Sequence, residues 1–208
     1  YTAVYGAAGC HACGAHAVRV DSDNNIWVVD APGHVVYKMN FQGHVLMELG
    51  LKGVAGRSKN TFNLPTDVAF GSDGSVYVSD GYGNARVVKY TADGQYLLEW
   101  GSRGIGPGEF GLPHNLAVDV DDRVYVTDRD NQRVEVFDDE GGFLSEWTDI
   151  GGNSALFMTA DQHLWTGGTL RDLDGKSIAR LPGGTGGHGM TESGDGEVFV
   201  AQLAGRVQ

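Results

Sequence analysis

The chain has 208 residues and a formal net charge of −12 at pH 7, with 33 glycines and only 5 prolines. This acidity argues against nucleic acids and anionic membrane surfaces as partners, and no apolar run approaches the ~20 residues of a membrane-spanning helix. Helical periodicity is weak, whereas short segments rich in Val, Tyr, Phe and Trp recur along the chain. We therefore expect an all-β protein with a solvated acidic surface.

The chain begins with Tyr1 and shows no signal peptide, so we expect a processed protein or part of a longer one. Residues 1–6 have strand character and are expected to contribute an outer strand that helps to close a ring of sheets. Cys10 and Cys13 are the only cysteines, and their spacing suits a local disulfide, free thiols, or half of a metal site completed by a histidine such as His11. The disulfide interpretation, which we favour, places the protein in the extracellular space or the periplasm.

One segment, residues 112–148, shows the organisation of the chain most clearly. Its strands are predicted at 115–120, 124–127, 133–137 and 143–147, between turns rich in Asp, Asn and Gly. Four antiparallel strands in a meander make one blade of a β-propeller. Similar repeats, the last two fainter, occupy residues 15–50, 64–101, 153–182 and 187–208. We predict a single propeller domain over residues 1–208, with loops between blades at 50–63 and 101–110.

A register common to the repeats identifies candidate metal ligands. In the clear repeats the second strand ends on Asp30, Asp80 or Asp128, and the position fourteen residues earlier holds His16, Thr66 or His114. In the two weaker repeats the same position holds Ser154 and His188. First strands line the central channel of a propeller, so these positions form a ring around its axis.

Histidine thus stands at this position in alternate repeats. Alternate blades of a six-bladed ring stand about 120° apart, so His16, His114 and His188 converge from three sides. Such a tripod is typical of catalytic zinc, although a single channel histidine can also be merely solvated. A ring of five blades would make the first and last repeats neighbours and break this symmetry. We therefore favour six blades, the sixth completed by residues 1–6 with further residues, or by another chain.

Four motifs carry a resemblance to a known family. They are Leu-Pro-Thr-Asp-Val-Ala-Phe at 64–70, Val-Tyr-Val-Ser-Asp-Gly-Tyr-Gly-Asn-Ala-Arg at 76–86, Pro-Gly-Glu-Phe-Gly-Leu-Pro-His at 107–114 and Thr-Asp-Arg-Asp-Asn-Gln-Arg at 127–133. From about Ala15 onward the chain resembles NHL-repeat propellers and, more closely, the peptidyl-α-hydroxyglycine α-amidating lyase domain. That family cleaves a terminal hydroxyglycine from a peptide, leaving a peptide amide and glyoxylate.

The resemblance implies roles for five residues. The zinc ligands of the family correspond to His16, His114 and His188, and its active-site tyrosine and arginine correspond to Tyr82 and Arg129. Zinc would lower the pKa of the substrate hydroxyl, Tyr82 as phenolate would take up the proton, and Arg129 would bind a carboxylate. The alternatives are that Tyr82 is an exposed turn aromatic and that Arg129 is a surface charge paired with Asp128 or Asp130.

Three departures from the family pattern limit this transfer. The family carries a further blade, with a second active-site arginine, before the first histidine repeat, and this chain has no counterpart to it. Gly189 stands where the family has an aspartate ligand for structural calcium, which argues against calcium here. Gly83 stands where a family cysteine would form a disulfide beside the tyrosine, so that bridge cannot form.

Two classes of function therefore remain. One is a zinc lyase of the amidating type, acting on a peptide end or a small hydroxylated amide. The other is a secreted, non-catalytic NHL propeller that serves as a binding or assembly module and self-associates through an open blade edge. A sugar or lactone hydrolase ranks last, because it would need carboxylates at channel positions that hold His, Thr and Ser.

Overall fold

The computed structural model describes residues 14–150, 155–182 and 187–201. The strand expected at residues 1–6, the Cys10–Cys13 pair and Ser154 lie outside them. Within the described ranges every regular element is a β-strand. No helix long and apolar enough to cross a membrane is found among these residues.

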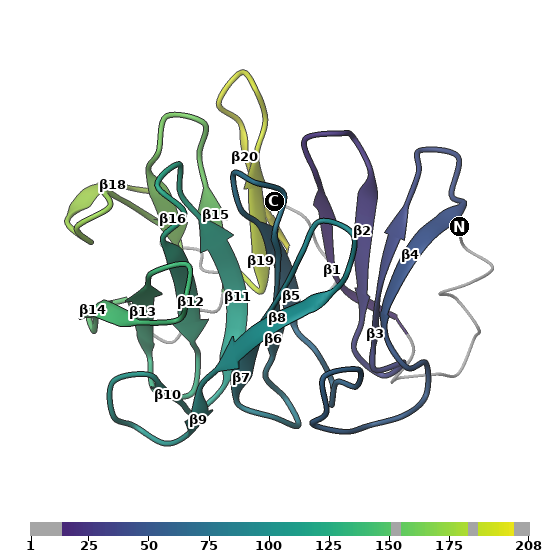
Figure 1. Ribbon diagram of the computed structural model, residues 1–208. Helices are drawn as coiled ribbons and strands as arrows, with labels where there is room; N and C mark the ends of the chain where they lie inside the picture. Colours follow the sequence, from purple (N-terminus) through teal and green to yellow (C-terminus); the bar gives the residue numbers. More distant parts are fainter. Residues whose placement is uncertain (1–13, 151–154, 183–186, 202–208) are drawn as a thin grey trace.

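Four sheets are antiparallel meanders of four strands each, with the strands in chain order (Figure 1). Blade 1 consists of β1 (Ala15–Val20), β2 (Ile26–Asp30), β3 (Val35–Met39) and β4 (Val45–Gly50). Blade 2 consists of β5 (Asp67–Phe70), β6 (Val76–Asp80), β7 (Arg86–Tyr90) and β8 (Tyr96–Trp100). Blade 3 consists of β11 (Pro113–Val118), β12 (Val124–Asp128), β13 (Arg133–Phe137) and β14 (Phe143–Trp147). Blade 4 consists of β15 (Leu156–Met158), β16 (Leu164–Thr166), β17 (Thr169–Arg171) and β18 (Ser177–Arg180).

Blade 5 comprises, in the described residues, the antiparallel pair β19 (Gly189–Glu192) and β20 (Val198–Ala201). The first strands of consecutive blades lie next to one another, from β1 to β5, β11, β15 and β19. This confirms the all-β architecture of repeated blades and places the first strand of each blade innermost. The total number of blades stays a prediction.

The segment 101–110, predicted as a plain loop, contains a short parallel pair. In it β9 (Ser102–Arg103) pairs with β10 (Glu109–Phe110). The Phe110 side chain explains why this segment is regular. It is fully buried in the hydrophobic core between blades 2 and 3 and so anchors the end of the segment.

The first strand of blade 3 also differs from the prediction, running over 113–118 rather than 115–120. The Asp119 carboxylate accepts hydrogen bonds from the backbone N–H groups of Asp121 and Arg123, which starts the turn two residues earlier. At the other end, Pro113 pairs with Asp128 across a bulge that the alternation of apolar residues does not reveal.

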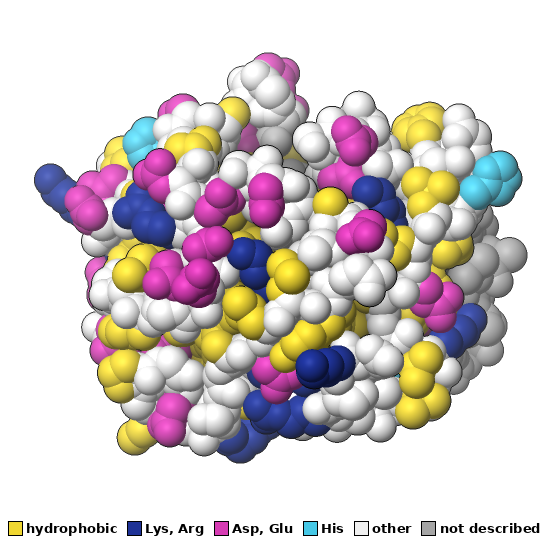
Figure 2. Space-filling model, in the orientation of Figure 1, with side chains coloured by type: hydrophobic (Ala, Val, Ile, Leu, Met, Phe, Trp, Pro, Cys, Tyr) yellow, Lys and Arg dark blue, Asp and Glu magenta, His cyan; other side chains and the backbone are white. Residues whose placement is uncertain are grey.

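The hydrophobic core lies in layers between neighbouring blades. The layer between blades 1 and 2 joins Trp27, Val29 and Val36 to Val68, Val78 and Val88. Similar layers lie between blades 2 and 3, blades 3 and 4, and blades 4 and 5. Each blade therefore depends on its neighbours to bury its faces. Figure 2 shows acidic side chains scattered over the visible surface, as expected of a solvated acidic protein.

Candidate metal centre

Three histidines from alternate blades meet at the centre of the molecule. Candidate ligand atoms of His16, His114 and His188 all lie within 4.8 Å of one another. The ring centroids are 4.9 Å apart between His16 and His114, and 4.7 Å from His188 to each of the other two. The structure thus brings together the residues that the repeat register selected, in a nearly equilateral triangle. Their role as zinc ligands stays a prediction.

β-Bulges coincide with two of these histidines. The pairing of β1 with β2 shifts register between Ala15 and Ala17, on either side of His16. The pairing of β11 with β12 shifts between Pro113 and Leu116, around His114. A bulge turns a side chain away from the ordinary alternation of a strand. The two bulges therefore alter the directions in which the imidazoles of His16 and His114 leave their strands.

The hydrogen bond at Nδ1 of His16 sets the tautomer of this ring. Nδ1 lies 2.5 Å from the backbone oxygen of Thr66, which can only accept, so Nδ1 carries the proton. The lone pair on Nε2 is then available for a metal. Thr66 occupies the same register position in blade 2, but its hydroxyl lies within hydrogen-bond distance of the Ser79 hydroxyl and the Pro113 oxygen instead of reaching the centre.

His114 is fully buried. Its Nδ1 lies 2.8 Å from Oδ1 of Asn115, and its Nε2 lies 3.1 Å from the hydroxyl of Tyr82. The same hydroxyl lies 2.9 Å from Nε2 of His16. Tyr82 follows β6 and is partly buried, so it is not merely an exposed turn aromatic.

Arg129 lies beside this tyrosine. Its guanidinium carbon is 5.5 Å from the centre of the Tyr82 ring, while its Nε is 3.2 Å from the Asp130 carboxylate in a half-exposed ion pair. The ion pair that the surface interpretation expected with Asp130 is present, and the active-site role of Arg129 stays a prediction. Asp128, the other expected partner, pairs with Arg133.

The environment keeps the three imidazoles neutral. Burial lowers the pKa of His114 to about 3 and that of His188 to about 4, and it also lowers the pKa of His16. The positive charge of Arg129 acts in the same direction on all three. At neutral pH the rings are therefore in the form that binds metal ions.

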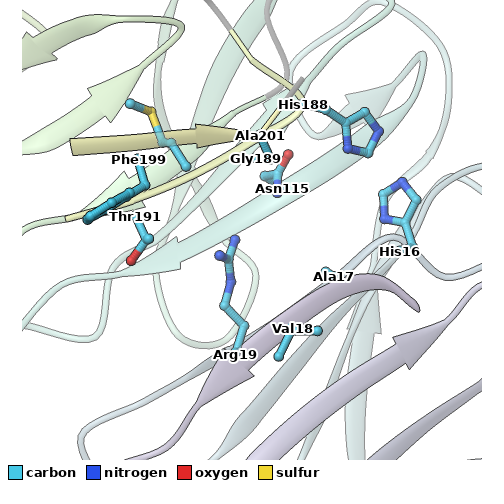
Figure 3. A pocket seen from close by; sticks show the side chains of 11 residues that line it. His16, Ala17, Val18, Arg19, Asn115, His188, Gly189, Thr191, Phe199 and Ala201 are labelled. Carbon is cyan, nitrogen blue, oxygen red and sulfur yellow. The ribbon is translucent and has the colours of Figure 1, made fainter. Parts of the chain in front are cut away.

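A cavity of about 290 Å³ lies beside the histidines, between β1 and the strands of blade 5 (Figure 3). His16 and His188 border it, together with Arg19, Asn115 and Phe199. Arg19, Asn115 and the buried Asp67 behind them are site residues that the sequence reasoning missed. For Asp67 and Asn115 the available signal was a polar residue directly after the shared register position of Thr66 and His114, whereas Arg19 lies three residues after His16.

Comparisons with known proteins agree with this architecture. The NHL repeat family matches residues 62–90 and 110–137. Peptidylglycine alpha-amidating monooxygenase of Rattus norvegicus is 40% identical over 131 residues, which are 59% of this chain and 13% of that protein. Probable peptidyl-alpha-hydroxyglycine alpha-amidating lyase pgal-1 of Caenorhabditis elegans is 31% identical over 212 residues, 90% of this chain and 61% of that protein.

NHL repeat-containing protein 3 of Homo sapiens is also similar, with 33% identity over 164 residues, 73% of this chain and 47% of that protein. The chain thus spans less than two thirds of the length of these relatives. Among solved structures, a streptogramin B lyase superposes with a TM-score of 0.66 at 17% identity, covering 92% of this chain and 66% of that one. At such low identity the likeness supports the fold alone.

Proposed function

We propose that this NHL-repeat β-propeller, which resembles the peptidyl-α-hydroxyglycine α-amidating lyases, is itself a zinc-dependent lyase of that type. It would cleave the C–N bond of a terminal hydroxyglycine and release a peptide amide and glyoxylate. The observation that carries the proposal is the triangle of His16, His114 and His188, with the Tyr82 hydroxyl within hydrogen-bond distance of two of the rings.

The donor set suits zinc. Three neutral imidazoles leave one coordination position open, as in catalytic zinc sites with three protein ligands. At His16 and His114 the proton is held on Nδ1, so Nε2 is free to bind. When bound, zinc would supply a Lewis acid that lowers the pKa of the substrate hydroxyl.

The protein side chains would carry the proton and orient the substrate. Tyr82, as phenolate, takes the proton from the hydroxyl of the hydroxyglycine. The O–H electrons form the carbonyl of glyoxylate, the C–N electrons go to the amide nitrogen, and Tyr82 returns the proton to that nitrogen. The Arg129 guanidinium binds the substrate carboxylate. Every proton and electron pair is then accounted for without a further reactant.

Metal content is the first test. We expect about one zinc per wild-type chain and its loss in His114→Ala, since three protein ligands are needed for tight binding. His44→Ala, at an exposed position on blade 1, is the matched control and should keep the zinc. A lyase assay on a hydroxyglycine-ended peptide, with glyoxylate as the readout, follows on the zinc-loaded protein. Folded wild-type protein without zinc would contradict the proposal.

A second candidate function is a non-catalytic module that associates with itself. The observation favouring it is the exposure of apolar side chains on blade 1, where Val18 is 54% and Val20 is 60% exposed on the innermost strand β1. Sedimentation velocity tests it: concentration-dependent dimers that Val18→Lys and Val20→Lys abolish would favour the module. A monomer at all concentrations would count against it.

We also propose that the protein acts outside the cytosol, on the basis of the Cys10–Cys13 spacing alone. Mass spectrometry of non-reduced peptides tests this. A peptide two hydrogen masses lighter than its reduced form would support a disulfide, and two alkylatable thiols in protein from an oxidising compartment would contradict it.

A further inference from the structure

A chain of polar side chains, buried except for the partly buried Arg19, runs from His114 across three blades. Asn115 follows His114 on β11 and is 4% exposed, and Asp67 on β5 is fully buried. Arg19 on β1 reaches the same carboxylate. Figure 3 shows Arg19 directed toward Asn115 in the wall of the cavity beside the histidines.

The contacts of Asp67 define its role. A single oxygen, Oδ2, receives Arg19 at 2.5 Å, Nδ2 of Asn115 at 2.9 Å and the backbone N–H of Leu116 at 3.1 Å. The other oxygen, Oδ1, receives the N–H of Val68 at 2.9 Å. With three donors directed at it, Oδ2 has no room for a proton and acts only as an acceptor.

This arrangement dictates the orientation of the Asn115 amide. Its NH₂ group must face Asp67, so its oxygen must face His114. Nδ1 of His114 must then donate its proton to that oxygen, which leaves the lone pair on Nε2. With the amide turned over, NH₂ would face Nδ1, the ring proton would sit on Nε2, and this nitrogen could not bind a metal.

We infer that Asp67, acting through Asn115, is a positioning residue that selects the metal-binding tautomer of His114. The inference rests on the proposed metal site. At His16 the Thr66 carbonyl selects the tautomer without an intermediary, because a backbone oxygen cannot exchange places with a donor group. The side-chain amide of Asn115 can rotate and exchange its oxygen and NH₂ group, so it needs a fixed acceptor for the NH₂ group, which Asp67 provides. Arg19 compensates the buried charge of that acceptor.

The test has one readout that needs no metal. ¹⁵N NMR of the metal-free protein at pH 7.5 reports which nitrogen of His114 carries the proton. We expect Nδ1–H in the wild type and a mixture of tautomers in Asn115→Leu and Asp67→Asn. Two variants are used because either substitution can impair folding by itself. Zinc titration of the same proteins should show affinity reduced about 10- to 100-fold in both variants.

Asp119→Asn is the matched control. It alters a different buried carboxylate, located in blade 3, which accepts from Arg123 and Tyr125 at the far end of β11. The tautomer populations of His114 and the zinc affinity should both match those of the wild type.

The outcomes separate this inference from the proposed function. A shifted tautomer in a protein that binds no zinc supports the positioning role and contradicts the zinc lyase. Unchanged tautomer populations in both variants, or unchanged zinc affinity where the wild type does bind zinc, would overturn the positioning role and leave the lyase standing.

Discussion

The hydroxyl group of Tyr82 lies within hydrogen-bond distance of two imidazoles at the centre of the molecule. The Tyr82 oxygen lies 2.9 Å from Nε2 of His16 and 3.1 Å from Nε2 of His114, but it has a single proton to donate. It can therefore satisfy only one of them at a time. A metal ion held by the three histidines would favour the deprotonated phenol, which is the form that the proposed proton transfer requires.

Removal of this hydroxyl should reduce catalysis without removing the metal. In Tyr82→Phe we expect kcat for the hydroxyglycine peptide to fall about 10²- to 10⁴-fold, the usual contribution of a positioned acid–base group. Zinc content should stay at the wild-type value, because the three imidazoles remain. Glyoxylate release and metal analysis on the same sample measure both. Wild-type turnover in Tyr82→Phe would remove Tyr82 from the proposed mechanism.

The pKa values of the histidines predict how the stability of the metal-free protein depends on pH. In the folded protein the pKa of His114 is about 3 and that of His188 about 4, whereas the unfolded chain binds these protons near pH 6.5. Below about pH 6.5 the unfolded state therefore holds more protons, and the free energy of unfolding must decrease as the pH falls toward 4.

Urea titrations between pH 7.5 and 4.5 measure this slope. His114→Gln should flatten it, because one of the neutral buried imidazoles is gone. His44→Gln, on an exposed side chain, should leave it unchanged. A slope that is the same in all three proteins would show that the tripod does not account for the pH dependence.

Paired Asp and Arg residues join the elements of blades 2 and 3 to the segments that precede them. Arg86 is fully buried and donates to Asp80 at 3.0 Å, to Glu99 at 2.5 Å and to the Thr61 oxygen at 2.7 Å. In blade 3, Asp128 pairs with Arg133 in the same way and accepts from the N–H groups of Gly111 and Leu112. The contacts of Asp128 fix the chain just before β11, the strand that carries His114.

Burial decides how much each arginine contributes to stability. Arg86→Met should lower the free energy of unfolding by about 3–5 kcal/mol, because it leaves the buried Asp80 without its counter-charge. Arg57 provides the matched control, since it approaches the same Glu99 at 3.6 Å with its side chain 46% exposed. Arg57→Met should cost at most about 1 kcal/mol. Equal losses on chemical denaturation would show that burial is not the deciding factor.

Across the whole molecule, the histidine triangle connects blades that are not neighbours. His16 belongs to blade 1, His114 to blade 3, and His188 directly precedes the first strand of blade 5. Each core layer between blades in the described part of the chain joins two consecutive blades. A metal ion at the triangle would therefore add a direct link between the first and the last described blades.

Zinc should consequently stabilise the fold as a whole. At a free concentration 100 times its Kd, zinc should raise the free energy of unfolding by about 2.7 kcal/mol. Hydrogen exchange should slow most in β1 and β19, at the two ends of the array. His114→Ala should show neither effect. Zinc-induced protection limited to β11 would contradict a link between the blades.

Strand positions were predictable where local signals were strong. The strands at 133–137 and 143–147 agree with the structure to the residue, because turns rich in Asp, Asn and Gly mark where they begin. The first strand of blade 3 was misplaced by two residues. Its bulge at His114 depends on how β11 meets β12, and this pairing leaves no trace in the periodicity of one strand.

The sequence by itself determined the repeated blades and the common position of His16, His114 and His188, because both follow from a regular spacing along the chain. Only the tertiary structure decided which nitrogen of His114 carries the proton. That choice depends on Asp67, which lies 48 residues from both Arg19 and Asn115 in the sequence and meets them on adjacent inner strands. Hydrogen bonds between side chains are short and directional, so they exist only once the blades have packed.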